Sequence, residues 1–137
     1  IDVNMFAVGD PAVAELFLRG DDGDPTLTRT QMFAYLNLVN TQLFLAEDQF
    51  YQHSEGLIGD DHHAGLVAWL KYGRGVNPGF RAMWEILRGL YRGEFRAFID
   101  GTVREAASIS PPDVHVQWLA SVATERERTK GTPGASP

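Results

Sequence analysis

The side chains best suited to metal binding or acid–base chemistry lie mostly between residues 47 and 63. They are the histidines His53, His62, His63 and His115, with the carboxylates Glu47, Asp48, Glu55, Asp60 and Asp61. Metal sites on helix bundles use Glu-x-x-His or His-x-x-x-His spacings, which place both ligands on one helical face. Neither spacing occurs in this chain. Glu47 and His53, six residues apart, face different sides of a helix.

Adjacent histidines do not make up for the missing spacing. His62 and His63 begin an expected helix, so the two rings do not face one ion without help from elsewhere. The metal candidates are therefore His53, His62, His63 and Asp61, and their spacing argues against a bound metal or another cofactor. A metal- or small-ligand-binding pocket near Tyr51, His53, His62, His63 and Trp69, with a catalytic or sensing role, remains the alternative.

Covalent catalysis finds no support in the sequence. The chain has no cysteine, which excludes thiolate ligands, Cys nucleophiles and disulfides. No Gly-x-Ser-x-Gly elbow is present, and the remaining serines of interest lie at expected helix ends or turns: Ser54, Ser108, Ser110 and Ser121. We expect no catalytic residues, and the sequence favours a non-enzymatic protein.

Two other groups of polar residues lie on expected helices. The first is Asn37, Asn40, Thr41, Gln42 and Glu47, and the second is the basic row Arg81, Arg88, Arg92 and Arg96. Buried amides in the first group would fix the register of a bundle, with ligand binding as the alternative. The second group is either a solvated face or a contact for phosphate or anionic lipid.

The helix that must position these residues runs from Thr28 to about Ser54. It is the longest stretch without Gly or Pro, and its apolar residues recur three and four apart at Met32, Leu36, Val39, Leu43, Ala46 and Phe50. Thr28 and Gln31 form a capping box, and Gly56 suits a left-handed helix end. A helix that is apolar around most of its circumference lies in the middle of a bundle.

Cap and breaker residues divide the rest of the chain. We expect helices over 10–20, over 61–72 with Asp60 as cap, from Asn77-Pro78, after Gly93, and a short one from Asp113. Residues 1–9 are ambiguous, and residues 125–137 predict a polar, flexible tail. No alternating strand pattern occurs. The fold class is therefore all-α, a bundle of five or six helices organised around residues 28–54, with residues 1–110 as the bundle and 111–137 as an appended segment.

Two loops invite a ligand interpretation that their spacing does not support. The acidic loop 21–25 lacks the Gly and Glu positions of an EF-hand, so we expect a solvated turn. Gly73-Arg74-Gly75 is not followed by the Gly-Lys-Ser/Thr of a phosphate-binding loop, and it is better explained as a helix stop.

Charge and hydropathy limit the partners. The 137 residues carry a formal net charge of −6, which argues against nucleic acid. Residues 1–68 hold 11 acidic and 2 basic side chains, and residues 69–137 hold 7 and 10, so the halves either neutralise each other or the basic half faces a phosphate-bearing surface. The longest apolar run near the middle, residues 43–46, is far shorter than the roughly 20 residues that span a bilayer.

Several short motifs, taken in their order along the chain, resemble those of a group of known proteins. They are Asp10-Pro11-x-x-Ala14-x-Leu16-Phe17-x-x-Gly20, Phe50-Tyr51-Gln52-His53-x-x-Gly56-Leu57-Ile58, Trp69, Pro78-Gly79-Phe80-Arg81-Ala82-x-Trp84 and Glu94-Phe95-Arg96-x-Phe98-Ile99-Asp100. Residues 10–107, about 70% of the chain, resemble uncharacterised bacterial proteins that have one N-terminal membrane helix followed by a small all-helical domain. The resemblance ends after Ser110. It implies a membrane anchor that precedes Ile1, and it implies no activity and no catalytic residues.

The sequence thus predicts a membrane-tethered interaction or scaffold domain that serves as an accessory subunit of a bacterial membrane complex. The cytoplasmic side of the membrane is slightly favoured as its location. The segment 111–137 is the expected partner-binding part, through Trp118, Arg126 and Arg128. An anionic-lipid-binding domain that uses the arginine row is a further alternative.

Overall fold

The structure, a computed structural model, describes residues 9–131. Within them the chain forms six α-helices and no strand. Their bounds are α2 Pro11–Asp21, α3 Arg29–Ser54, α4 Asp60–Ala68, α5 Pro78–Leu87, α6 Gly93–Ala106 and α7 Val114–Lys130, with a π-helical turn η1 at Trp69–Gly75 and a 3₁₀ turn η2 at Arg88–Leu90. The predicted all-α class is confirmed. The expected membrane anchor, residues 1–8 and residues 132–137 of the expected tail lie outside the described residues.

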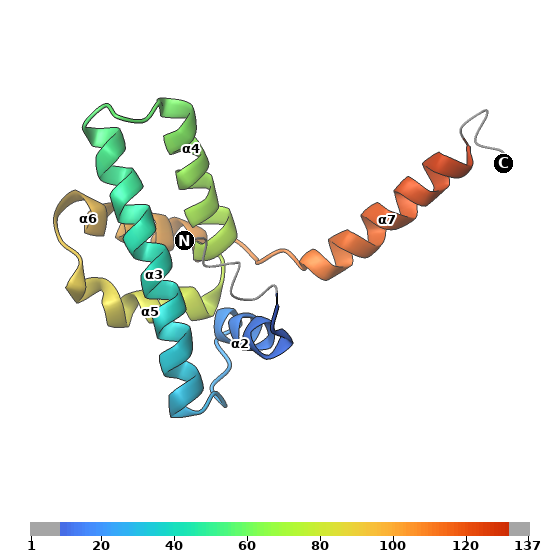
Figure 1. The fold of residues 1–137 in the computed structure, drawn as a ribbon, viewed down its shortest axis with the longest axis horizontal. Helices are drawn as coiled ribbons and strands as arrows, with labels where there is room; N and C mark the ends of the chain where they lie inside the picture. Colours follow the sequence, from blue (N-terminus) through green and yellow to red (C-terminus); the bar gives the residue numbers. More distant parts are fainter. Residues whose placement is uncertain (1–8, 132–137) are drawn as a thin grey trace.

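The long helix predicted from Thr28 is α3, with 26 residues. Its capping box is formed: the Thr28 Oγ1 accepts from the Gln31 N–H at 3.1 Å, and the Gln31 Oε1 accepts from the Thr28 N–H at 2.9 Å. In Figure 1 α3 crosses the whole bundle, and the other helices of the bundle lie around it. This helix contacts α2, α4, α5 and α6, so the bundle is organised around it as predicted, but it is not enclosed: Phe33, Phe44 and Leu45 of its apolar pattern are exposed.

The core lies where α3 meets α5 and α6. Its largest fully buried side chains are Trp84, Tyr91, Phe80, Phe95, Leu43, Leu70, Ile99 and Val39. Only Leu43 and Val39 come from α3, and most of the others come from the segments after residue 78. The core therefore forms only when the second half of the chain packs onto α3.

Two residues that the sequence predicts as N-caps, Asp60 and Asn77, do not cap their helices with their side chains. Gly59 is the N-cap of α4, and Asp60 lies in the first turn, where its carboxylate contacts His53 instead of capping backbone N–H groups. Asn77 is the N-cap of α5 without a side-chain cap bond, because its amide donates to the Gly73 carbonyl at 3.0 Å. In both cases a tertiary or preceding-turn partner displaces the local cap.

The C-terminal helix α7 is longer than the sequence predicts. Asp113 caps it by accepting from the Val116 N–H at 3.0 Å, and the helix continues through Lys130, over residues expected to be a flexible tail. None of its residues is buried. Figure 1 shows α7 projecting away from the bundle at the end of the segment that follows α6. Among residues 9–131, no helix is both long and apolar enough to cross a bilayer.

Candidate functional site

Two of the expected metal candidates, His53 and His63, meet at the tip of the α3–α4 hairpin together with Asp60, but not in a chelating arrangement. His53 Nε2 lies 2.9 Å from an oxygen of Asp60, and the His53 and His63 rings stack 3.8 Å apart and only 7° from parallel. Ring-nitrogen lone pairs lie in the ring plane, so two parallel planes do not direct both rings at one ion. His62 and Asp61 are exposed. Within residues 9–131, no three His, Cys, Asp or Glu side chains form a group suited to a metal.

The surroundings of His63 favour the neutral form of its ring. Its ring packs beside Phe50 of α3 and Phe98 of α6, and its Nδ1 is buried without a hydrogen-bond partner. Burial, and then the charge of His53, lowers the pKa of His63, while Asp60 acts in the opposite direction. The neutral ring is therefore the form that suits the folded hairpin.

We expect the stability of the fold to fall as the pH drops below 6.5, the unfolded pKa of histidine, because of His63. A histidine whose pKa is lower in the folded chain than the unfolded value of 6.5 contributes stability above that pH. This contribution is lost as the pH falls through the lowered pKa. His63→Gln is expected to flatten the dependence of the urea midpoint on pH over this range. His62→Gln, one exposed residue away, is the control and should keep the wild-type slope; equal slopes in His63→Gln and wild type would contradict the assignment.

The other residues of the expected small-ligand pocket have structural partners. The Tyr51 hydroxyl donates to the Arg92 carbonyl at 3.5 Å, and Trp69 packs against Gly73. A cavity of about 560 Å³ lies elsewhere, between α2, η1 and the segment before α7. None of the expected pocket residues lines it. The ligand-binding alternative gains no support from this geometry.

A buried charge network joins four elements of the bundle, and sequence reasoning missed it. The Arg74 guanidinium donates to both Asp21 carboxylate oxygens, at 2.7 and 2.8 Å, and the Tyr35 hydroxyl donates to Asp21 Oδ1 at 2.7 Å. The guanidinium also lies over the Phe17 and Phe80 rings, 4.9 and 5.1 Å from their centroids. Burial, and then the Asp21 charge, raises the pKa of Tyr35 above its ordinary value.

Two interpretations from the sequence are corrected by this network. Asp21 is buried at the end of α2 and not part of a solvated turn, and Arg74 is 4% exposed. The Gly73-Arg74-Gly75 segment does end a helix, but as a π-helical turn that carries Arg74 inward. A Cβ on Gly75 would lie 2.9 Å from the Ala106 Cβ and 3.0 Å from the Leu70 carbonyl, so the glycine lets η1 approach α6. Each of the three side chains pairs with another within the fold, and of the Arg74 guanidinium only the buried Nε has no hydrogen-bond partner among the described residues, so we interpret the network as structural.

The polar set of α3 also serves the fold. The Asn40 Oδ1 accepts from the Tyr91 hydroxyl at 2.6 Å, which ties the end of η2 to α3. Gln42 is buried, and its Oε1 has no hydrogen-bond partner. Thr41 bonds back to the Asn37 carbonyl at 2.8 Å. The Asn40 contact supports the register-fixing interpretation of this group.

The four arginines do not present one free basic row. Arg88 is paired with Asp100, at 3.1 and 2.7 Å, and Trp84 Nε1 donates to the same carboxylate at 2.8 Å. The hydrogen bond from Arg88 holds the pKa of Asp100 below its ordinary value. Arg81 donates to the Gly75 carbonyl at 2.9 Å. Arg92 is exposed and Arg96 partly so, and lipid or phosphate contact through these two stays a prediction.

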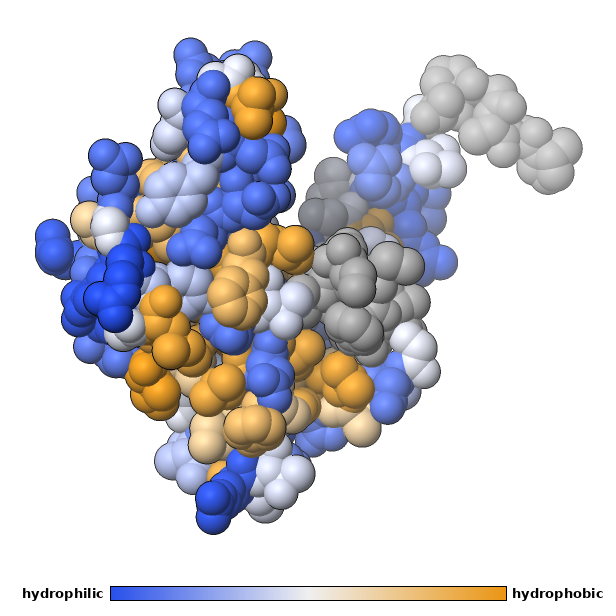
Figure 2. All heavy atoms as spheres, turned by 60° about the vertical axis from the view of Figure 1, so that its left-hand side comes forward, coloured by the Kyte–Doolittle hydropathy of each residue, from blue (hydrophilic) through white to orange (hydrophobic). Residues whose placement is uncertain are grey.

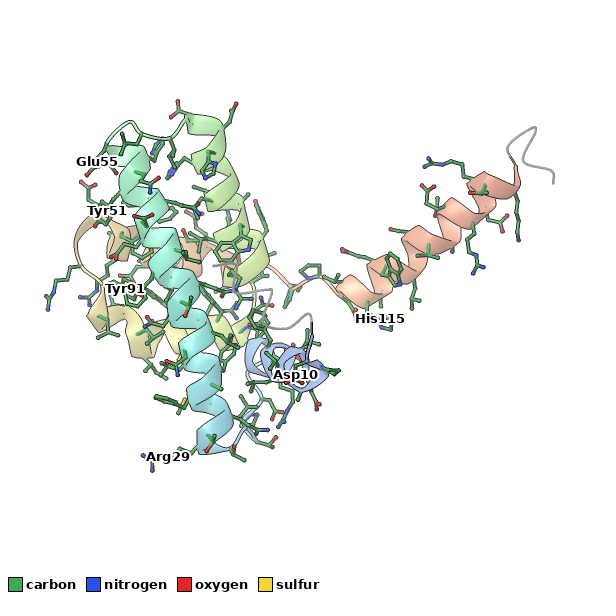
Figure 3. All side chains as sticks on the ribbon, viewed as in Figure 1. Asp10, Arg29, Tyr51, Glu55, Tyr91 and His115 are labelled. Atoms are coloured by element: carbon green, nitrogen blue, oxygen red, sulfur yellow. The ribbon has the colours of Figure 1, made fainter. Side chains whose placement is uncertain are left out.

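The expected partner-binding residues lie on the most solvated element. Trp118 is 63% exposed, and Arg126 follows it two turns later on the same side of α7. Arg128 pairs with Glu125 at 2.8 Å. An open depression of about 560 Å³ runs along this side of the helix, lined by Trp118, Ser121, Val122, Glu125, Arg126, Thr129 and Lys130. Figure 3 shows the side chains of α7 standing clear of the bundle, with His115 at its start.

A second apolar surface lies on the bundle itself. We call it the α3–α5 face and define it by the exposed side chains Phe33 and Phe44 of α3, Ile86 of α5 and Leu90 of η2. Phe44 packs 5.7 Å from the Tyr91 ring, which places it next to η2. Figure 2 shows apolar residues gathered in one continuous area on this side of the bundle. Large exposed apolar patches are common at protein–protein interaction sites.

Comparison with known proteins gives no match: no protein-family model, no curated protein and no solved structure corresponds to this chain. The resemblance seen in residues 10–107 therefore rests on the residues quoted for it alone.

Proposed function

We propose that this chain is a non-enzymatic interaction domain, in which the α2–α6 bundle is a rigid carrier and α7 is the partner-binding helix. One observation carries the proposal: α7 has 17 residues and buries none of them. In proteins, most of the stability of a helix comes from the packing of one of its faces, which α7 lacks within the described residues. A solvated helix with a large aromatic side chain on it gains that packing from a partner.

The residues of α7 suit different roles in a binding surface. Trp118 is the anchor of the binding surface, because exposed Trp side chains dominate the energetics of many interfaces. Arg126 and Arg128 belong to the polar rim, where charged residues contribute to specificity and association rate more than to affinity. The polar second half of α7 keeps the free helix in solution.

The proposal also includes tethering to a bacterial membrane, as an accessory subunit of a complex at the cytoplasmic face. What supports this part is the resemblance of residues 10–107 to proteins with one N-terminal membrane helix. The full-length gene product should then fractionate with membranes and stay there at high salt. Release into the soluble fraction by salt would contradict an inserted anchor.

Removing residues 111–137 is expected to abolish co-purification with membrane partners while the bundle keeps its cooperative unfolding. The physical reason is that α7 buries nothing against the bundle, so its loss removes binding surface and leaves the core intact. The measurements are pull-down from native membranes and circular dichroism during thermal unfolding.

Point variants in the intact chain sharpen this test. Trp118→Ala should reduce partner recovery at least tenfold, as removal of a hot-spot side chain does. Gln117→Ala, on the neighbouring exposed position, is the matched control and should bind as wild type. Full recovery with both Trp118→Ala and the truncated chain would remove α7 from the binding role.

A further inference from the structure

Two apolar surfaces without a partner lie on different sides of the described molecule. One is the stripe Val114, Trp118 and Val122 on α7, and the other is the α3–α5 face. In Figure 1 α7 extends from one side of the bundle, and the view in Figure 2, which brings the other side forward, shows the apolar area of the bundle. Since α7 points away from this face, the two surfaces of one copy do not meet, whereas those of two copies can.

The two surfaces match in spacing and in charge. On α7 an apolar row with i, i+4 spacing ends in Arg126, which makes no ion pair within the described residues. On α3 the row of half-buried Leu36, half-buried Asn40 and exposed Phe44 has the same spacing, and it shares Phe44 with the α3–α5 face. The row ends in the exposed Asp48, whose carboxylate also accepts from the Gln52 side chain at 2.8 Å. If the helices run in the same direction, Val122 lies opposite Phe44 and Arg126 lies opposite Asp48. Two i, i+4 rows interdigitate when helices cross at about −50°.

The centre of this match pairs a large side chain with a small one. Trp118 would lie opposite Asn40, between the exposed side chains Phe44 and Leu90. The Asn40 Oδ1 already accepts from Tyr91 at 2.6 Å, and a carbonyl oxygen has a second lone pair for the indole N–H of Trp118. The reversed helix direction would instead bring Arg126 toward Arg29 at the start of α3, and like charges disfavour it.

We propose that the partner surface of α7 is the α3–α5 face of a second copy of this chain, with the two helices running in the same direction and Arg126 against Asp48. The inference rests on the proposed function, because it names the occupant of α7. The contact joins two different surfaces and is heterologous, so it builds closed rings or head-to-tail chains unless two copies exchange α7 reciprocally.

Light scattering after gel filtration, over about 1–100 µM protein, tests this assembly. Wild-type protein should associate with rising concentration. Trp118→Glu and Phe44→Glu should each be monomeric, because each removes one of the two surfaces. An equimolar mixture of the two variants should form a one-to-one complex, since one supplies an intact α3–α5 face and the other an intact α7.

The charge pair tests the direction of the helices. Arg126→Asp and Asp48→Arg should each weaken association several-fold, and the chain with both changes should recover it. Leu57→Glu is the control for a general loss of apolar surface, since Leu57 is 69% exposed but lies outside the α3–α5 face. Equal loss of association in Leu57→Glu, or no recovery in the double variant, would overturn the proposed contact.

A wild-type chain that stays monomeric at about 100 µM would overturn the second-copy partner. If Trp118→Ala in that case still loses its partner from native membranes, the interaction function of α7 stands and only the identity of the partner is wrong. If neither experiment depends on α7, both proposals fail. Unfolding midpoints equal to that of the wild type establish that each variant is folded.

Discussion

Asp21→Ala is expected to lower the free energy of unfolding by about 3–5 kcal/mol, the range found when one partner of a buried ion pair is removed. The variant leaves the Arg74 guanidinium, which is 4% exposed, without its carboxylate and deprives the Tyr35 hydroxyl of its acceptor. Both groups remain too buried to recover full hydration. The two aromatic rings around the guanidinium do not replace a carboxylate.

Urea denaturation followed by circular dichroism measures this effect. The matched control is Asp22→Ala, which changes the next residue, exposed at the end of α2, and should cost less than about 0.5 kcal/mol. A double variant, Asp21→Leu with Arg74→Met, should recover much of the lost stability, because apolar residues often replace a buried pair without loss. An Asp21→Ala variant as stable as Asp22→Ala would show that Arg74 finds water or another acceptor.

Gly79→Ala is expected to cost about 3 kcal/mol or more, the upper range for overpacking a core. A Cβ at position 79 would collide with the Gly20 carbonyl oxygen and lie 2.7 Å from the Gly20 carbonyl carbon and 3.0 Å from that of Asp21. These are backbone atoms, which do not rotate away as a side chain would. The helices α2 and α5 must therefore separate, and α2 carries Asp21 away from Arg74.

The control for Gly79→Ala is Gly65→Ala. Gly65 lies within α4, and an added Cβ there meets nothing within 4 Å. Alanine at that position should raise stability by about 0.5–1 kcal/mol through its better helix propensity. Thermal unfolding of the two variants under the same conditions measures both the expected loss of stability and the expected gain. Similar midpoints for the two variants would mean that α2 and α5 tolerate a wider separation.

The sequence predicts the helices of this fold well because their signals are local. Thr28 and Gln31 lie three residues apart, so the capping box at the start of α3 is visible without the structure. Asp21 and Arg74, by contrast, are 53 residues apart, and neither carries a sign of its partner. Between them the only clue is the pair of glycines around Arg74, which also fits an ordinary helix end.

Of the two candidate interaction surfaces, one could be predicted from the sequence and the other could not. Trp118 on a polar, isolated segment indicates an interaction surface from the sequence alone, and the structure finds it exposed. The α3–α5 face is not visible in the sequence, because Phe33 and Phe44 belong to the same apolar pattern as the core residues of α3. Which apolar residues remain exposed depends on where α5 and η2 pack, and this is decided by contacts such as Tyr91 with Asn40.

The solvated position of α7 has a consequence for how this protein can change over generations. A substitution in the core must satisfy many neighbours at once, but a substitution on α7 meets no constraint from folding, because no residue of that helix is buried. Under the proposed function, selection on α7 acts mainly through binding. Related chains should conserve the volume and polarity of core positions such as Trp84 and Phe95, while changes on α7 should be matched by changes on the surface that it binds.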